Sequence, residues 1–316
     1  MKLYTAPMEG LTNHVFRNNF SKYYGGADKL FTPFIAAEGS IKLKKREVND
    51  IAPENNQGQF VVPQIISNNA DNFIRFARII AEMGYKEVNL NLGCPSGTVV
   101  SKGKGSGFLA KPDLLDEFLE MIYENLTDID VSIKTRIGLK KPEEIENLMK
   151  VYNRYPISEL IIHPRVREDY YNGKPRMDEF MYALKNSTNP VCYNGDVNTV
   201  SDYENIIQIC GKEIPVMFGR GLVRNPSLLN MIRYGEDKMT DKALLRQYHD
   251  EIYGIYRETM PGETVVIYKM KEIWHYMIDL FENNETYIKL LKKSHVLTDY
   301  NIFVKRIFRE CELKMR

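Results

Sequence analysis

A cysteine in a polar loop is the most reactive side chain that the sequence offers. Cys94 closes the segment 89–94 (NLNLGC), in which a short apolar run leads into a turn at Pro95. The stretch that follows, residues 101–107 (SKGKGSG), is rich in glycine and lysine. In cationic, partly exposed surroundings a cysteine can act as a nucleophile or as a proton donor. Free cysteines are more often buried structural residues, and the residues alone leave both interpretations open.

Two glycine-bearing loops could bind a phosphate group. Asn194-Gly195-Asp196 and Gly219-Arg220-Gly221 each follow a short apolar run. Glycine lets backbone N–H groups approach a phosphate closely, and in eight-stranded α/β barrels the loops after strands seven and eight often bind phosphate. Glycine is also common in ordinary turns, so either loop alone is weak evidence. The pair predicts a ligand that carries phosphate, and flavin mononucleotide (FMN) is one such ligand.

Three further polar side chains could contact the rest of such a ligand. Gln64, Lys134 and His163 each lie where a β-rich segment gives way to polar residues. A lysine ammonium beside a flavin ring would stabilise its reduced, negatively charged form, and a glutamine can both donate to and accept from the ring edge. Alternatively, the lysine reaches solvent along its own aliphatic stem and the histidine is structural.

These candidates need a scaffold that gathers distant segments, and the spacing of apolar residues predicts one. Eight β-rich runs alternate with amphipathic helical stretches such as residues 72–83 and 114–123. This alternation predicts parallel βαβ units of the α/β class, and eight of them favour a (β/α)8 TIM barrel. The C-terminal strand ends of such a barrel share one mouth, where the candidates would meet. The runs are residues 3–6, 30–32, 61–65, 87–90, 131–134, 160–163, 191–193 and 216–218.

The character of the chain changes near residue 238. From Thr240 onward helical periodicity replaces the β-rich runs, which predicts a barrel over residues 1–238 and an all-helical domain over 239–316. Residues 289–316 carry eight Lys or Arg against three Asp or Glu. Such a basic end could hold RNA, or it could be an ordinary solvated helix face. Prominent in it are Lys289, Lys292, Lys293, Lys305, Arg306 and Arg309.

Composition narrows the function classes. The 316 residues are 43% hydrophobic and 27% charged, as expected for a globular protein with a core. Lys and Arg (43) balance Asp and Glu (42), so contact with nucleic acid must come from a local patch. The four cysteines form no C-x-x-C pair, which predicts neither a metal site nor disulfides and fits the cytoplasm. No apolar run predicts a secretion signal or a membrane span.

Taken together, the motifs resemble the tRNA-dihydrouridine synthase family. They occur in that family's order between about residues 4 and 226, and the Asn-x-Gly-Cys-Pro and Lys-x-Arg-x-Gly elements are the most diagnostic. The helical tail is similar to the family's C-terminal RNA-binding domain in position and pattern. The matching segments are APMEGLT (6–12) with Phe16-Arg17, Pro63-Gln64, NLNLGCP (89–95), GSGFL (105–109), IKTRIG (133–138), NGDV (194–197) and GRG (219–221).

The resemblance implies a role for each matching residue. Cys94 would be the general acid, Asn91 would face the target uracil, and Arg165 would contact its carbonyls. The family commonly has His-Gly-Arg where this chain has His163-Pro164-Arg165, so a backbone role there is in doubt. The implied flavin contacts are Pro7, Met8 and Glu9 through the backbone, Gln64 and Lys134 at the ring, His163 near ring and phosphate, and Asn194, Gly195, Asp196, Gly219 and Arg220 at the phosphate.

The implied reaction is reduction of the C5–C6 double bond of specific tRNA uridines to 5,6-dihydrouridine, with FMN as cofactor and NADPH (or NADH) as reductant. The chain has no separate G-x-G-x-x-G after a strand, which suits a reductant that uses the same mouth in turn. The tRNA position, the oligomeric state and any obligate protein partner are not predicted. Two alternatives are a flavin barrel acting on a free pyrimidine, such as a dihydroorotate dehydrogenase, and a catalytically inactive RNA-binding protein.

Overall fold

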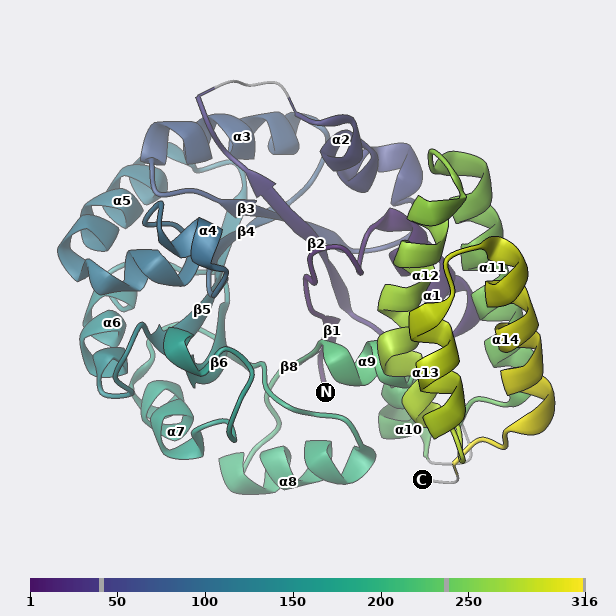
Figure 1. Ribbon diagram of the computed structural model, residues 1–316. Helices are drawn as coiled ribbons and strands as arrows, with labels where there is room; N and C mark the ends of the chain where they lie inside the picture. Colours follow the sequence, from purple (N-terminus) through teal and green to yellow (C-terminus); the bar gives the residue numbers. More distant parts are fainter. Residues whose placement is uncertain (40–42, 236–238, 315–316) are drawn as a thin grey trace. The chain divides into compact units, whose positions relative to one another are not determined.

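The protein contains a closed barrel of eight parallel strands in a computed structural model that describes residues 1–39, 43–235 and 239–314 (Figure 1). Each strand pairs with the next along the chain, and β8 pairs with β1. The predicted (β/α)8 TIM barrel with a C-terminal helical region is confirmed. The strands are β1 (Leu3–Thr5), β2 (Lys29–Ala36), β3 (Val61–Ile66), β4 (Glu87–Leu92), β5 (Asp130–Gly138), β6 (Leu160–Val166), β7 (Val191–Tyr193) and β8 (Val216–Phe218).

Two strands continue through prolines at which the sequence predicts turns. Pro33 lies inside β2 and Pro164 inside β6, and the strand pairing shifts register at both. A β-bulge accommodates proline because its extra residue needs no ladder hydrogen bond. β5 is also longer than predicted, so Lys134 and His163 lie within strands rather than at strand ends.

Helices between the strands bury one apolar face each. In α3, the side chain of Asn69 caps the first turn by accepting from the N–H of Asn72, and Phe73, Phe76 and Ile80 are buried at helical spacing. The helices between β1 and β8 are α1 (His14–Tyr23), α2 (Lys45–Ile51), α3 (Ala70–Glu82), α4 (Gly97–Val100), α5 (Pro112–Asn125), α6 (Glu144–Tyr152), α7 (Met177–Asn186) and α8 (Val200–Cys210), with 3-10 turns η1 (Pro53–Asn55), η2 (Gly105–Ala110) and η3 (Arg167–Asp169).

Inward-facing side chains fill the barrel. Because side chains alternate along a strand, every second residue of each strand points inward, and these residues form one core. Tyr4, Phe31 and Ile161 are fully buried in this cluster. Cys192 on β7 is buried with them, and burial raises the pKa of its thiol well above the ordinary range. A cysteine in this position is a packing residue.

The chain forms two compact units. The first consists of Met1–Pro7, Asp28–Asp196 and Ile207–Phe218 and holds all eight strands. The second consists of Met8–Ala27, Val197–Ile206 and Gly219–Arg316. The boundary expected at residue 238 lies among residues 236–238, outside the described residues, and stays a prediction.

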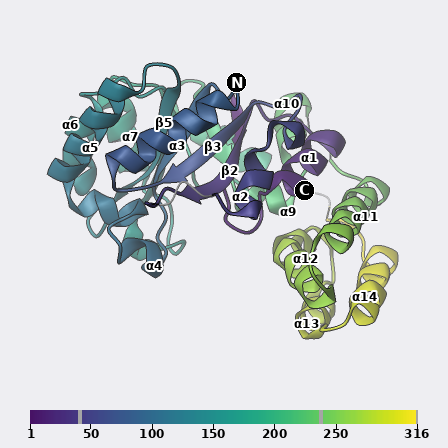
Figure 2. The same cartoon turned by 90° about the horizontal axis from the view of Figure 1, so that it is seen from above.

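The C-terminal part of the second unit is a helical bundle in which α12 packs against α11, α13 and α14 (Figures 1 and 2). The apolar residues of α12, including Val266, Met270 and Met277, are buried. Tyr300 of α14 links three helices, because its hydroxyl lies 2.7 Å from Nε2 of His249 and accepts from the Trp274 indole at 2.9 Å. The helices from β8 onward are α9 (Arg220–Arg224), α10 (Leu228–Tyr234), α11 (Lys242–Thr259), α12 (Glu263–Met277), α13 (Glu285–Lys293) and α14 (Leu297–Glu310), with the turn η5 (Ile278–Leu280).

The described residues contain neither a helix suited to span a membrane nor a metal-binding cluster. Within residues 1–39, 43–235 and 239–314, no helix is both long and apolar enough to cross a membrane. The same part of the chain contains no group of three or more His, Cys, Asp or Glu side chains that could hold a metal ion.

Candidate active site

The backbone of Cys94 forms hydrogen bonds through both its N–H group and its carbonyl. It follows β4, and Oδ1 of Asn91 accepts from the N–H groups of Gly93 and Cys94 at 3.1 and 2.9 Å. The carbonyl of Cys94 accepts from the backbone N–H and the hydroxyl of Ser106, at 3.1 and 2.8 Å. Cys94 is partly exposed, whereas the other three free cysteines are buried. Cys94 therefore has a fixed backbone and is partly exposed to solvent beyond the end of a barrel strand.

Gly105 allows this close approach of the two segments. A Cβ built on it would lie 2.9 Å from the carbonyl oxygen of Cys94 and 3.0 Å from the Cys94 Cβ, and its φ of +56° is in the left-handed region. Any larger residue would push the 105–107 segment away from the Cys94 loop. The glycine-rich stretch therefore acts as a close-packed support.

A chain of buried amides connects this loop to the barrel wall. Nδ2 of Asn91 donates to Oε1 of Gln64 at 2.7 Å, and Nε2 of Gln64 donates to Oδ1 of Asn89 at 2.7 Å. Asn89 then donates to the Ser132 hydroxyl at 2.9 Å. The register that places Gln64 opposite Asn89 makes the chain possible. Gln64 and Asn91 are thus buried and bonded within the protein, and their predicted contacts with flavin and uracil stay predictions.

Lys134 is a partly buried cation to which the described residues offer no partner. It lies on β5 directly across from Asn91, and no hydrogen bond or ion pair reaches its ammonium from the described residues. Burial, and then the positive charge of Arg136, lower the pKa of Lys134 to about 8. Cys192 and, to a smaller extent, Cys94 act in the opposite direction and favour the charged form. An ammonium in this state is stabilised by any anion that binds beside it.

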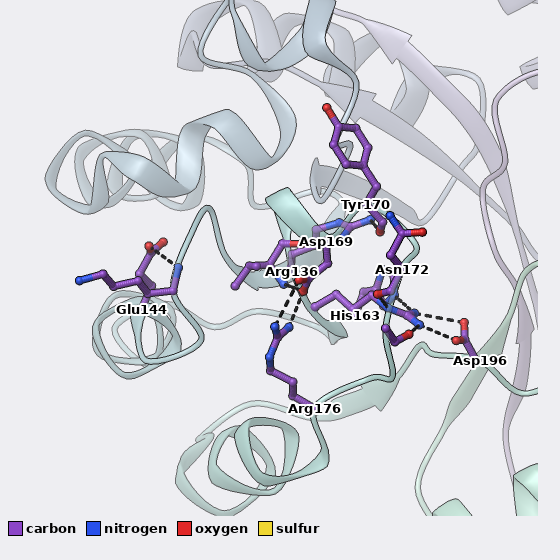
Figure 3. A network of polar contacts seen from close by, with 12 residues as sticks. Arg136, Glu144, His163, Asp169, Tyr170, Asn172, Arg176 and Asp196 are labelled. Atoms are coloured by element: carbon purple, nitrogen blue, oxygen red, sulfur yellow. Dashed lines mark hydrogen bonds and ion pairs between the residues drawn. The ribbon is translucent and has the colours of Figure 1, made fainter.

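Arg165 ties the predicted residues of β6 and of the loop after β7 into one network (Figure 3). Its Nη1 lies 3.0 Å from Nε2 of His163 and 3.1 Å from Oδ1 of Asp196, and its Nη2 donates to the other Asp196 oxygen. The remaining donors reach the carbonyls of Asn172 and Gly173. All five N–H groups are engaged, so a contact with uracil would have to replace one of them.

The contact with Arg165 also orients His163. An arginine can only donate, so in this contact Nε2 of His163 is the acceptor. The negative charge of Asp196 is balanced by Arg165.

The two predicted halves of the phosphate site fall in different units. In the first unit, Asn194 donates from Nδ2 to the carbonyl of Met217 at 2.9 Å, and a Cβ at Gly195 would lie 2.1 Å from the Tyr193 hydroxyl. In the second unit, Gly219 precedes α9 and Arg220 begins it.

The residues predicted from the APMEG motif divide in the same way. Pro7 belongs to the first unit, whereas Met8 and the exposed Glu9 belong to the second. The N–H of Met8 donates to the Thr12 hydroxyl at 2.8 Å, and its carbonyl accepts from the N–H groups of Leu11 and Thr12. The Met8 backbone is therefore fixed by the turn that leads into α1.

Comparison with known families decides the classification. The family model for dihydrouridine synthase (Dus) matches residues 4–310. The chain belongs to the dihydrouridine synthase family. It is thus an enzyme of this family, as the sequence predicts.

Relatives named as tRNA-dihydrouridine synthases match the chain, and solved structures share its fold. The chain is 26% identical over 232 residues to tRNA-dihydrouridine synthase B of Pasteurella multocida, covering 73% of this chain and 68% of the relative. It is 29% identical over 238 residues to tRNA-dihydrouridine(16) synthase of Cupriavidus necator, covering 73% of each. An old yellow enzyme homologue from Zymomonas mobilis superposes with a TM-score of 0.52 at 10% identity, over 76% of this chain and 90% of that one. Histamine dehydrogenase from Rhizobium sp. 4-9 gives 0.56 at 10% identity, over 89% and 51%. At these identities the structures show the fold alone.

Two residues of this dihydrouridine synthase site were given no role by sequence reasoning. Arg136 is buried and donates to the carbonyls of Gly93, Val166 and Tyr170 at 3.0, 2.9 and 2.7 Å, so it joins the Cys94 loop to the loop after β6. Tyr171 is 54% exposed, and its ring centroid lies 5.5 Å from the Arg136 guanidinium and 6.3 Å from the His163 ring. Arg136 stands in the IKTRIG motif, which was a usable signal, whereas no pattern singled out Tyr171.

Proposed function

We propose that this protein reduces the C5–C6 double bond of specific uridines in tRNA to 5,6-dihydrouridine, with FMN as cofactor, NADPH (or NADH) as reductant and Cys94 as general acid. The observation that carries the proposal is the partly exposed Cys94, whose own backbone makes three hydrogen bonds and whose neighbour Gly93 makes a fourth. Near it lies the Lys134 ammonium, for which the described residues supply no partner. The family assignment and the names of the relatives support tRNA as the substrate.

The charges of the site fit a flavin. Lys134 has a lowered pKa and no anionic partner in the described part of the chain, and a reduced flavin ring would supply the missing negative charge. Asp196 is neutralised by Arg165, so it would not repel a phosphate that the backbone of its loop approaches. Gly195 is partly exposed, and it has no room for a side chain. The residues that would hold FMN are Pro7, Met8, Glu9, Gln64, Lys134, His163, Asn194, Gly195, Asp196, Gly219 and Arg220.

The protein's own chemistry in this reaction is a proton transfer. When bound, FMN supplies a hydride to C6 of the uracil. Negative charge then develops at C5 and on the adjacent carbonyl. Unless a proton arrives at C5, the hydride transfer reverses. Cys94 would donate the proton from its thiol, and the hydrogen bonds from Gly93 and Cys94 to Asn91 hold the sulfur in place for this step.

Substrate binding would depend on the basic end of the chain. A uridine inside a folded tRNA has to be extruded before its C5 and C6 can be reached, and this requires a firm grip on the surrounding backbone. Lys289, Lys292, Lys293 and Lys305 are exposed, and none forms an ion pair with another described residue. Residues 239–316 would thus bind tRNA through phosphate contacts. Asn91 and Arg165 would face the uracil, Arg165 only after exchanging one of its present partners.

The test is reduction of a defined tRNA by the purified protein. Wild-type protein with NADPH and a tRNA transcript should produce dihydrouridine, and the protein should be yellow from flavin. Cys94→Ala should keep flavin and tRNA binding but lose about two to four orders of magnitude in reduction rate, the usual scale for a general acid. Cys210→Ala, which changes a buried cysteine on α8, is the control and should remain active.

Two results would count against the proposal. Full activity of Cys94→Ala would remove Cys94 from the reaction. The function itself would be refuted if the purified protein formed no dihydrouridine in any tRNA isolated from a cell that lacks the protein. A reducing, cytoplasmic location is part of the same proposal and stays a prediction.

A further inference from the structure

The loop that follows β6 is held rigidly although it lies outside the regular elements. Arg136 donates to the carbonyls of Val166 and Tyr170, and Arg165 donates to those of Asn172 and Gly173 (Figure 3). Arg176 binds the carboxylate of Asp169 from the far end of the loop. Charged hydrogen bonds to several carbonyls fix the backbone of this loop, so the loop's side chains point in a defined direction.

Tyr170 has an unfavourable backbone conformation in this loop. Its φ is +51° and its ψ is −97°, in the positive-φ half of the backbone map, which favours glycine. Among the described residues, Asn283 is the other non-glycine residue with positive φ, and asparagine tolerates it well. An aromatic residue gains nothing from this conformation, so the reason for tyrosine must lie in its side chain.

The ring of Tyr170 does not pack into the core. Its side chain is 42% exposed, and Figure 3 shows it pointing away from the polar contacts of the loop. The Arg167 guanidinium lies 4.9 Å from the ring centroid, and Nε of Arg167 is buried without a hydrogen-bond partner in the described part of the chain. The neighbouring Tyr171, against Arg136 and His163, is also exposed. The loop therefore presents an aromatic face beside a cation.

We propose that Tyr170 is a positioning residue that stacks on the nucleotide next to the target uridine, with Arg167 beside that nucleotide's phosphate. The proposal rests on the proposed function. Extruding a uridine removes the stacking partner of its neighbour, and an exposed aromatic ring can replace that partner whatever the base. An arginine in contact with the ring adds charge for the phosphate without selecting sequence.

The backbone strain makes a clean experiment possible. Tyr170→Gly removes the ring and suits the backbone, so the holoenzyme should unfold at the same temperature as wild type or higher. It should lose about 5- to 150-fold in kcat/KM for tRNA, mostly through KM, which is the range for one stacked base. The rate of flavin reduction by NADPH should not change. Tyr170→Phe should restore tRNA activity, and Tyr182→Ala on α7 is the matched exposed-tyrosine control.

A binding measurement separates this inference from the proposed function. We would place 2-aminopurine on either side of the target uridine in tRNA and record its fluorescence with each holoenzyme. At one of the two positions, wild type and Tyr170→Phe should quench the fluorescence, whereas Tyr170→Gly and Tyr170→Asn should not. Equal quenching by wild type and Tyr170→Gly would overturn the inference. A decrease in kcat/KM for tRNA with Tyr170→Phe as large as with Tyr170→Gly would overturn it too. If probes placed on both sides of a uridine that wild type binds but does not reduce show the quenching pattern, only the proposed function fails.

Discussion

Replacing Lys134 with methionine should make the flavin-free protein more stable and the flavin complex weaker. Methionine has a similar length and flexibility, so it fills the same space without the charge. The Lys134 ammonium is partly buried and has no partner among the described residues, and this lowers its pKa from the ordinary 10.5 to about 8. At 1.36 kcal/mol per pH unit the burial of the charge costs about 3 kcal/mol. Some of the side chain is exposed, so this is an upper bound.

The sign of the pH dependence follows from the same shift. Below pH 8 the lysine is protonated in the folded and unfolded states, and the full cost is present. Between pH 8 and 10.5 the unfolded chain binds a proton that the folded chain does not, so wild-type stability rises with pH relative to Lys134→Met. The advantage of the variant should therefore be largest at pH 7 and should vanish near pH 10.5.

Denaturant unfolding of both flavin-free proteins at pH 7, 8.5 and 10 measures this difference directly. FMN titration followed by flavin fluorescence should show about 10- to 100-fold weaker binding to Lys134→Met, the range for one lost hydrogen bond to a charged group. A variant less stable than wild type at pH 7 would refute the claim that the ammonium lacks a partner. Unchanged FMN affinity would show that Lys134 is not at the flavin.

Three further perturbations test other parts of the molecule. Asn91→Ala removes the acceptor for the N–H of Cys94 and should lower uridine reduction about tenfold or more, with a smaller effect on flavin affinity; steady-state kinetics and flavin titration measure both. His249→Phe breaks the bonds to Asp250 and Tyr300 and should destabilise the protein by about 1–3 kcal/mol in denaturant unfolding. Changing three exposed lysines to alanine should reduce the slope of log tRNA affinity against log salt by about two, measured by filter binding; the three are Lys289, Lys292 and Lys293.

Much of the barrel could be predicted because its signal is local. Each buried parallel strand is a short β-rich run between turn residues, and the eight runs correspond to the eight strands. The prolines misled the prediction of strand length, since a bulge that accepts Pro33 or Pro164 depends on the neighbouring strand rather than on the local sequence. The convergence of Gln64, Cys94 and Lys134 at one end of the barrel follows from topology alone.

The hydrogen-bond partners could not be predicted because they depend on register. Asn91 has the same local sequence whether it faces a ligand or supports a loop, and only its place across from Lys134 and beside Gln64 decides. For Arg165, the number of engaged donors is set by the loop after β6, which no periodic pattern describes. Side chains that bind backbone carbonyls leave little trace in composition or spacing.

Three of the cations at this end of the first unit divide into two kinds. Arg136 and Arg165 are fully or almost fully buried, and they direct their donors mainly to carbonyls of the loops that carry Cys94 and Tyr170. Planar guanidinium groups suit this task because several donors leave in fixed directions. Lys134 donates to no described residue, and burial, together with the positive charge of Arg136, lowers its pKa. A structural cation is most stable when all its donors are hydrogen-bonded within the protein. A cation that binds a ligand must keep its donors unbonded, which lowers the stability of the ligand-free protein. The contrast between the two arginines and Lys134 therefore separates support from chemistry within one site, and the Lys134→Met experiment measures that cost.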